Sequence, residues 1–330
     1  MSRPVPLKKG RGGFDLAALL KPSSSFSLSP ERAVNFSPNR FKRRPRRNRR
    51  WSLRLRFGIV HVMNAPPPHA GAVAPTGAQT ARALRYLVRV PLLLWHVLIH
   101  LPLLLLLTSP LTAQLPIGAE TLEHRLIRAW SAGLMRIFGF RLRRVGTPLA
   151  GATLFVANHV SWVDIEILHS QRMMGFVAKR EIASWPVVGW LAARGETIFH
   201  HRGNTESLGG VLHEMLARLR AGRSVGVFPE GGTRGGGEIG PFHARIFLAA
   251  VEAGVPVQPV ALRYGEHGDA QAVVAFQDKE SFFANFLRLL GEPGRLAEVH
   301  FLTPIAPGEA DGRRRIAELA RQRIVEAMAS

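Results

Sequence analysis

Between residues 145 and 330, short apolar runs alternate with longer segments in which apolar residues recur at helical spacing. Such alternation predicts strands that are each followed by a helix. The expected strands lie near 153–157, 175–178, 196–199, 224–228, 256–262, 271–276 and 297–302. The expected helices lie near 162–171, 186–193, 205–220, 243–253, 279–290 and 310–328. The pattern therefore predicts an α/β fold, a mostly parallel sheet with helices on both faces, in a domain that covers 145–330.

A leucine-rich stretch from Val90 to Ala113 precedes this domain and carries no charged side chain. Its length of about 24 residues is enough to cross a bilayer. Two histidines and three prolines interrupt it, namely His96, His100, Pro91, Pro102 and Pro110. Because Arg82, Arg85 and Arg89 come before it, we expect that end to face the cytoplasm. The pattern leaves open whether the stretch spans the membrane or re-enters it.

A second helix is expected after this stretch, because apolar residues recur on one helical face while the arginines lie elsewhere. The apolar face consists of Leu122, Leu126, Trp130, Leu134 and Phe138. A helix of this kind lies in the membrane interface or packs on the core of its own domain, and the periodicity favours neither. We assign residues 84–144 to membrane-associated helices.

The net charge of +21 is concentrated at the beginning of the chain. Residues 1–62 hold 16 Lys and Arg against two acids, a net charge of +14, which leaves +7 for the remainder. Without helical or strand periodicity, residues 1–83 are expected to be disordered, and they suit anionic lipid or nucleic acid. The alternative is that residues 1–62 are a spurious extension, because Met63 opens a Pro/Ala/Gly-rich lead typical of the start of a membrane protein.

A histidine and a carboxylate stand five residues apart where the expected strand 153–157 meets the next helix. Ser161, followed three residues later by Asp164, is typical of a helix start. His159 then lies on the turn and Asp164 in the first helical turn, so the two side chains can meet. A histidine with a carboxylate on its other ring nitrogen can take the proton of an attacking alcohol. The structural alternative is that Asp164 only caps the helix and His159 only completes the turn.

The stretch from Asn158 to Asp164 resembles the His-x4-Asp signature of the glycerolipid acyltransferases, in particular the bacterial 1-acyl-sn-glycerol-3-phosphate (lysophosphatidate) acyltransferase family. The resemblance implies that His159 is the general base and that Asp164 orients it. It also implies N-terminal membrane-embedded helices ahead of a domain that faces the cytosol.

Three further blocks follow in the order of that family. In Gly195–Gly203, Arg202 matches an arginine that meets the substrate phosphate, although His201 replaces the usual acidic residue. Val225–Arg234 resembles Phe-Pro-Glu-Gly-Thr-Arg with one extra glycine. Val255–Val260 matches the family strand Val-Pro-Val-x-Pro-Val, whose role there involves the acyl donor or the shape of the site. The third block implies four residues that hold the head of the acceptor: Glu230, Gly231, Thr233 and Arg234. The resemblance implies that Glu230 accepts from a hydroxyl or steadies the loop.

Other chemistries have weaker support. The absence of cysteine excludes disulfides, thiolate metal sites and a cysteine acyl-enzyme. Ser224 sits in a Gly-x-Ser-x-Gly pattern, but a strand follows it where the nucleophile elbow needs a helix. A metal-dependent hydrolase remains the alternative of another class, since His200, His201 and His213 accompany His159, yet their spacing matches no ligand motif.

We therefore expect an acyltransferase that moves a fatty acyl chain from acyl-CoA or acyl carrier protein to the free hydroxyl of a lysophospholipid. Lysophosphatidate is the first expected acceptor, and lyso-ornithine lipid is the alternative, because the altered second and third blocks leave room for it. We expect no cofactor, no metal and no nucleic-acid partner. The expected location is the bacterial cytoplasmic (inner) membrane, in contact with membrane lipids.

Overall fold

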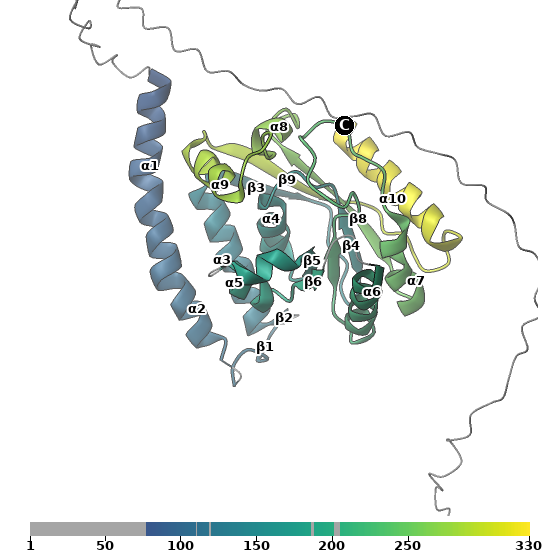
Figure 1. Cartoon of the computed structure of the whole chain (residues 1–330). Coiled ribbons are helices and arrows are strands. Elements are labelled where there is room, and N and C mark those ends of the chain that lie inside the picture. Colours follow the sequence, from purple (N-terminus) through teal and green to yellow (C-terminus); the bar gives the residue numbers. More distant parts are fainter. Residues whose placement is uncertain (1–76, 110, 119, 186–187, 201–204) are drawn as a thin grey trace, which may run out of the picture. The chain divides into compact units, whose positions relative to one another are not determined.

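In a computed structural model of the chain, residues 77–109, 111–118, 120–185, 188–200 and 205–330 are described (Figure 1). The basic tail, the alternative start at Met63 and the candidate phosphate ligand Arg202 lie outside the described residues. All the described residues belong to one compact unit.

Seven strands form one sheet in the order β3-β9-β8-β4-β7-β5-β6. Their bounds are β3 Phe140–Val145, β4 Leu154–Ala157, β5 Gly175–Lys179, β6 Ile198–His200, β7 Val225–Val227, β8 Val257–Tyr264 and β9 Arg295–Phe301. The strands β8, β4, β7, β5 and β6 run parallel to one another. Strand β9 is antiparallel to β8, and β3 is parallel to β9. The predicted mostly parallel α/β sheet is confirmed.

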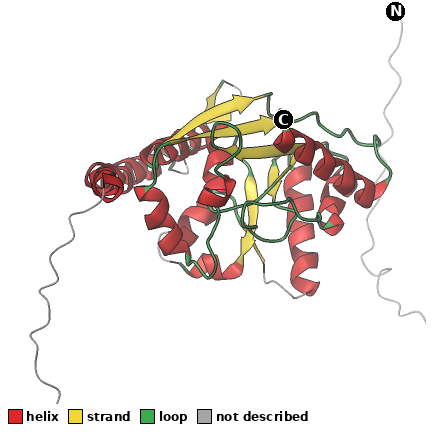
Figure 2. Cartoon of the chain, turned by 90° about the horizontal axis from the view of Figure 1, so that it is seen from above, coloured by secondary structure: helices red, strands yellow, loops and turns green. Residues whose placement is uncertain are grey.

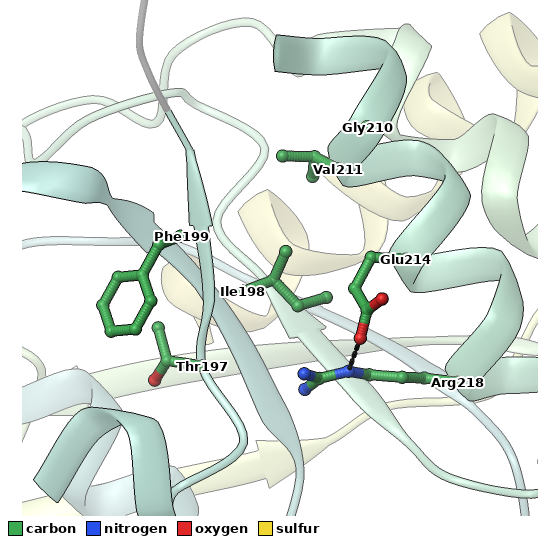
Figure 3. Close-up of a pocket in the computed structure, with 7 residues that line it drawn as sticks. All are labelled: Thr197, Ile198, Phe199, Gly210, Val211, Glu214 and Arg218. Carbon is green, nitrogen blue, oxygen red and sulfur yellow. Dashed lines mark hydrogen bonds and ion pairs between the residues drawn. The ribbon is translucent and has the colours of Figure 1, made fainter. Parts of the chain in front are cut away.

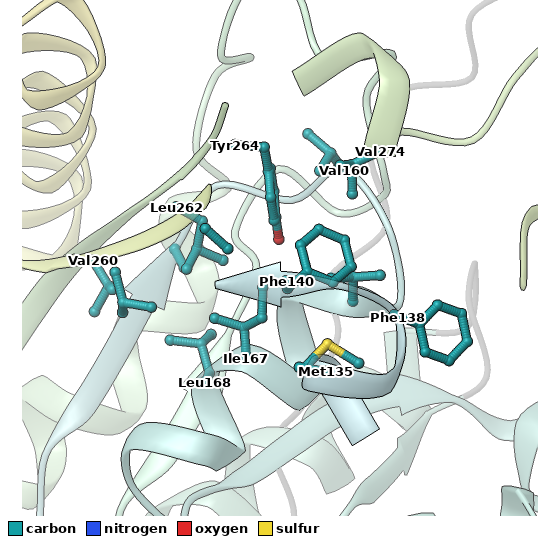
Figure 4. Close-up of a cluster of buried hydrophobic side chains, with 14 of the residues drawn as sticks. Met135, Phe138, Phe140, Val160, Ile167, Leu168, Val260, Leu262, Tyr264 and Val274 are labelled. Atoms are coloured by element: carbon teal, nitrogen blue, oxygen red, sulfur yellow. The ribbon is translucent and has the colours of Figure 1, made fainter. Parts of the chain in front are cut away.

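Helices cover both faces of this sheet, as Figure 2 shows from above. The helices of the domain are α3 Leu122–Ile137, α4 Val163–Gln171, α5 Val188–Arg194, α6 Thr205–Arg220, α7 Leu248–Ala253, α8 Gln271–Val274, α9 Phe282–Gly291 and α10 Gly312–Ala329, with short 3-10 turns η3 Arg180–Ser184 and η4 Ala244–Phe247. Side chains of α3, α4, α8 and α9 form the core on one face, and those of α6, α7 and α10 form the core on the other. Figure 4 shows the first of these clusters, with Tyr264 of β8 pointing into it.

The predicted strand 271–276 is wrong, because these residues begin the one-turn helix α8. A short apolar run does not distinguish a strand from a helical turn. Here Gln271 donates from Nε2 to the backbone oxygen of Leu262, 2.7 Å away, and folds the segment back over the end of β8. Strand β3 was not expected, because four of its six residues are basic or exposed, as suits the edge of a sheet.

Helix α3 packs on the core of its own domain. Leu134, Met135 and Phe138 are buried in the cluster that also contains Ile167 of α4. Of the two interpretations left open by the periodicity, the structure therefore gives core packing for this face. Together with β3, which begins at Phe140, α3 extends the folded domain ahead of the expected boundary at residue 145.

The leucine-rich stretch belongs to one long helix that runs from Gly77 to Leu107 through α1 (Gly77–Trp95), the π-helical segment η2 (His96–His100) and α2 (Leu101–Leu107). By length and composition this helix could cross a membrane. It begins inside the predicted tail and ends before Ala113. A two-residue hairpin, β1 Pro116–Ile117 with β2 Glu120–Thr121, then leads into α3.

One side of the long helix is fixed to the domain. His96 is buried, stacks on Trp130 of α3 with ring centroids 4.9 Å apart, and bonds the Trp130 carbonyl through Nε2 at 3.0 Å. A side chain at Gly133 would meet the His96 ring at 2.8 Å, so the close approach requires glycine there. The histidine that interrupts the apolar stretch therefore serves helix packing.

Candidate active site

Adjacent parallel strands place two of the predicted site residues side by side. Strand β4 ends at Ala157 and continues into His159, while its neighbour β7 ends at Val227 and continues toward Glu230. The backbone N–H of His159 donates to Oε1 of Glu230 over 3.1 Å. In open parallel sheets, ligands bind at this carboxyl edge of the strands. The two sequence blocks therefore meet where a substrate site is expected.

Asp164 is fully buried and accepts four hydrogen bonds. Its Oδ2 accepts from His159 Nδ1 at 2.8 Å and from the peptide N–H groups of Val160 at 2.7 Å and Ser161 at 3.0 Å. Its Oδ1 accepts from the hydroxyl of Tyr264. Asp164 thus holds both the turn before α4 and the histidine ring, so the structural role and the orienting role suggested by the sequence coexist. The helix start differs slightly from expectation, because Trp162 is the cap residue and Ser161 accepts from Val163 N.

The His159 ring is held by two contacts and is open at its second nitrogen. It stacks on Phe228 with ring centroids 3.9 Å apart and an interplanar angle of 13°. With Nδ1 directed at Asp164, Nε2 makes no hydrogen bond to a described residue, and 15% of the side chain is exposed. A neutral histidine that donates through Nδ1 presents a lone pair on Nε2, which is the form needed to accept a proton.

Tyr264 is a member of this cluster that sequence reasoning missed. It ends β8, lies 100 residues beyond Asp164 and is only 1% exposed. Burial, followed by the negative charge of Asp164 and their hydrogen bond, raises the pKa of Tyr264 well above its usual value, so the phenol stays protonated as a donor. Its only sequence signal was its position just beyond an expected strand, at the edge where His159 lies.

Asn158 joins the end of β4 to β8, the strand that carries Tyr264. Its Nδ2 donates to the Leu262 carbonyl at 3.0 Å, and its Oδ1 accepts from Leu262 N at 2.8 Å. These paired bonds join the end of β4 to β8 next to His159 and Tyr264, whose side chains both contact Asp164. The register of the two strands is therefore fixed at the site itself.

The Glu230 carboxylate is occupied by internal contacts. Besides the His159 N–H on Oε1, its Oε2 accepts from Gly240 N at 2.9 Å and lies 3.3 Å from Nε of Arg234. The residue is only 6% exposed. Of the two roles suggested for Glu230, binding a hydroxyl or steadying the loop, these contacts provide the second.

The glycine-rich loop after Glu230 stays next to His159 despite the extra glycine. Arg234 donates its backbone N–H to the His159 carbonyl at 3.0 Å, and its half-exposed guanidinium lies over Gly240. Gly231 has φ +75°, and a side chain there would press on the His243 ring at 3.0 Å. Thr233 is exposed on the same loop. The loop therefore keeps Gly231, Thr233 and Arg234 at the carboxyl edge.

Arg202 lies outside the described residues, and β6 is the described strand that precedes it. Strand β6 ends at His200 and runs parallel to β5, which runs parallel to β7. The carboxyl end of β6, at His200, therefore lies at the edge where His159 and Glu230 lie.

Neither rival site forms within the part of the chain that the structure describes. Within the described residues, no three side chains from His, Asp and Glu gather as metal ligands. Ser224 lies at the beginning of β7, where its hydroxyl donates to the Gly151 carbonyl at 2.9 Å. Ser224 is therefore at the opposite end of that strand from Glu230, and this position rules out Ser224 as a nucleophile at the site edge.

A separate hollow lies between β6 and α6 (Figure 3). It is lined by Thr197, Ile198, Phe199, Gly210, Val211, Glu214 and Arg218. Its two charged side chains pair with one another, with Arg218 Nε 2.9 Å from Glu214 Oε1. Strands β7 and β5 separate β6 from β4, so this hollow is not part of the His159 site.

Comparison with known proteins agrees with this geometry. The family model described as Acyltransferase matches residues 142–263, which include β4, β7 and most of β8. The lyso-ornithine lipid O-acyltransferase of Pseudomonas aeruginosa is 39% identical over 209 residues, which cover 62% of this chain and 78% of that protein. The 1-acyl-sn-glycerol-3-phosphate acyltransferase of Neisseria gonorrhoeae is 33% identical over 165 residues, which cover 49% of this chain and 64% of that protein.

The fold is also that of a solved acyltransferase. The crystal structure of the 1-acyl-sn-glycerophosphate acyltransferase PlsC from Thermotoga maritima matches with a TM-score of 0.55 over 74% of this chain and 96% of that one, at 19% identity. The sequence relationship to the P. aeruginosa protein identifies the family, and the structural match supports the fold. The chain belongs to the acyltransferase family of lipid biosynthesis.

Proposed function

We propose that this chain transfers an acyl group from a thioester to the free hydroxyl of a lysolipid, with His159 as the general base. The acceptor oxygen attacks the thioester carbonyl carbon while its proton passes to His159 Nε2. The carbon–sulfur bond then breaks, and the departing thiolate takes that proton from the imidazolium. No acyl-enzyme, metal or cofactor takes part, and the acyl donor is acyl-CoA or acyl carrier protein.

The arrangement that carries this proposal is the hydrogen-bonded series Tyr264–Asp164–His159, which ends on an imidazole nitrogen that makes no hydrogen bond to any of the described residues. Asp164 stabilises the imidazolium that forms and keeps the proton of the neutral ring on Nδ1. Since a thioester already has a good leaving group, a base for the alcohol is the main requirement. Arg202, Gly231, Thr233 and Arg234 are proposed to hold the acceptor head, with Glu230 supporting their loop.

Two acceptors fit the site, and they differ in their head group. Lysophosphatidate offers a phosphate to Arg202 and Arg234, because a guanidinium pairs well with phosphate oxygens. Lyso-ornithine lipid carries an amino acid head in its place. The longer match to the P. aeruginosa lyso-ornithine enzyme, 209 residues against 165 for the N. gonorrhoeae protein, favours lyso-ornithine lipid as the better acceptor.

We further propose that the enzyme works at the bacterial cytoplasmic membrane with its α/β domain on the cytoplasmic side. The outward side of the helix Gly77–Leu107 carries exposed leucines, among them Leu87, Leu98 and Leu106. Apolar side chains of this kind are stable in lipid. The opposite side of the helix is tied to α3 and α9, so the domain is held close to the bilayer.

The decisive experiment offers the purified protein lysophosphatidate and lyso-ornithine lipid side by side with a labelled acyl-CoA, and repeats it with acyl carrier protein as donor. Labelled diacyl product from at least one acceptor is expected, and none from His159→Gln. Failure to acylate either acceptor with either donor would contradict the proposal. Metal-dependent release of free fatty acid without an acceptor would instead favour the hydrolase.

A further inference from the structure

We infer that Tyr264 is a positioning residue for the His159–Asp164 pair, acting through the carboxylate. This inference rests on the proposed function. The Tyr264 hydroxyl donates to Oδ1 of Asp164, while Oδ2 receives the His159 ring and two peptide N–H groups. Each oxygen of the carboxylate thus has its own partners, and the group cannot rotate without breaking several bonds at once. The phenol therefore helps to fix the rotation of the carboxylate relative to the histidine ring.

The surroundings of Tyr264 hold the phenol rigidly. Its ring packs edge-on against Phe140 of β3 with centroids 5.9 Å apart. Its backbone oxygen accepts from Ala270 N at 2.8 Å, which starts the turn that α8 closes. Through Asn158, the strand that carries Tyr264 is joined to the strand that carries His159. Two strands and the start of α4 therefore meet at a single carboxylate.

The phenol of Tyr264 also affects how strongly the Asp164 carboxylate interacts with His159. A hydrogen bond to a carboxylate stabilises its negative charge and leaves less of it to stabilise a neighbouring imidazolium. Tyr264 therefore moderates how strongly Asp164 holds a proton on His159. The other charged groups against the His159 peptide among the described residues, Glu230 and Arg234, belong to the loop after β7 and do not contact Asp164.

Replacing Tyr264 by Phe removes this bond and keeps the ring. We expect kcat to fall about tenfold, because the Asp164 carboxylate then orients the His159 ring less well, and KM to stay nearly unchanged, because Tyr264 lies away from the substrate. The acidic limb of the pH profile of kcat/KM should move to higher pH, since the carboxylate then stabilises the imidazolium more strongly. In an Asp164→Asn background, the same substitution should add little to the loss.

The chain offers a matched control, because it contains only two tyrosines. Tyr86 of α1 donates its hydroxyl to the Leu287 carbonyl of α9 at 2.7 Å, far from Asp164 in the network of bonds. Tyr86→Phe loses one tyrosine hydrogen bond as well, but should leave the acidic limb where it is in the wild type. A folded Tyr264→Phe variant with wild-type kcat and an unmoved limb would overturn the inference.

Should Tyr264→Phe fail to fold, a second variant keeps the question open to measurement. Biosynthetic incorporation of 3-fluorotyrosine into Tyr86→Phe protein labels position 264 alone. Fluorination makes the phenol a stronger donor, so the acidic limb should move to lower pH, and no movement would contradict the inference. The fluorine resonance should also shift on Asp164→Asn, a readout that does not need acyl transfer, so failure of the proposed function is distinguishable from failure of this inference.

Discussion

Two helices of this protein begin beside a largely buried carboxylate, and only one of the two sites is suited to catalysis. At α4, Asp164 accepts from His159, from two peptide N–H groups and from Tyr264. At α9, Glu280 accepts from Gln277 N, from Asn285 Nδ2 and from two nitrogens of Arg288, at 2.7 to 2.9 Å. Both carboxylates organise a turn ahead of a helix. The difference lies in the side chain that each one holds.

The Arg288 guanidinium is engaged in structural hydrogen bonds. Besides pairing with Glu280, it donates to the carbonyls of Val273 and Ala275, and so ties α9 to α8. A guanidinium keeps its proton at all accessible pH values. A histidine side chain, by contrast, is of a type that can accept a proton, and the second ring nitrogen of His159 makes no hydrogen bond to a described residue. A carboxylate at a helix start therefore holds a structural pair at α9 and the proposed catalytic pair at α4, and the difference lies in the side chain that it binds.

The largest expected effect comes from removing the partner that can titrate. His159→Ala should lower turnover by at least about a hundredfold, since a positioned general base contributes that much or more. His159→Gln keeps a donor for Asp164 and a flat group against Phe228, yet it cannot take a proton, so it should lose a similar amount. Steady-state acyl transfer together with thermal unfolding measures both. Near-wild-type turnover in either folded variant would remove the distinction between the two carboxylate sites.

Removing the other carboxylate should give the opposite result, a stability loss with retained turnover. The hydrogen bond from Arg288, followed by those from Asn285 and Gln277, lowers the pKa of Glu280 to about 2 from its usual 4.5. Glu280→Gln is therefore expected to lower the free energy of unfolding at neutral pH by about 2 kcal/mol, less than the full shift implies because the pair is partly solvated. Urea unfolding at neutral pH measures this loss.

The pH dependence of that loss follows from the sign of the shift. Because the pKa of Glu280 is lower in the folded than in the unfolded protein, its contribution is present above pH 4.5 and is lost as the pH falls toward 2. The stability difference between wild type and Glu280→Gln should shrink across that window. A difference that stays constant, or a turnover that falls as in the His159 variants, would show that Glu280 acts otherwise.

The sequence predicted the turn that holds His159 and Asp164, but not the contact of Asp164 with Tyr264, because the signals of the turn are local. An apolar run ending at Ala157, then His159, then Ser161 and Asp164 define a strand, a turn and a helix start within a dozen residues. The Tyr264 contact spans 100 residues and depends on β8 pairing with β4 in one register, which no local pattern encodes. The helical turn of α8 was read as a strand for a similar reason, since its folding back depends on the Gln271 bond to Leu262.

The smallest expected difference concerns the serines at the two helix starts. Ser281 is the N-cap of α9, and its hydroxyl oxygen accepts from Ala284 N at 3.2 Å. Ser161 accepts from Val163 N at the same distance, but the turn before α4 is already held by Asp164 through two peptide N–H groups. Ser281→Ala should therefore cost about 1 kcal/mol of stability, and Ser161→Ala less, with turnover retained in both. Chemical denaturation of both variants measures the pair. A larger loss for Ser161→Ala would mean that Asp164 alone does not hold the turn before α4. The hydrogen bonds from the peptide N–H groups to Asp164 would then depend on the serine hydroxyl.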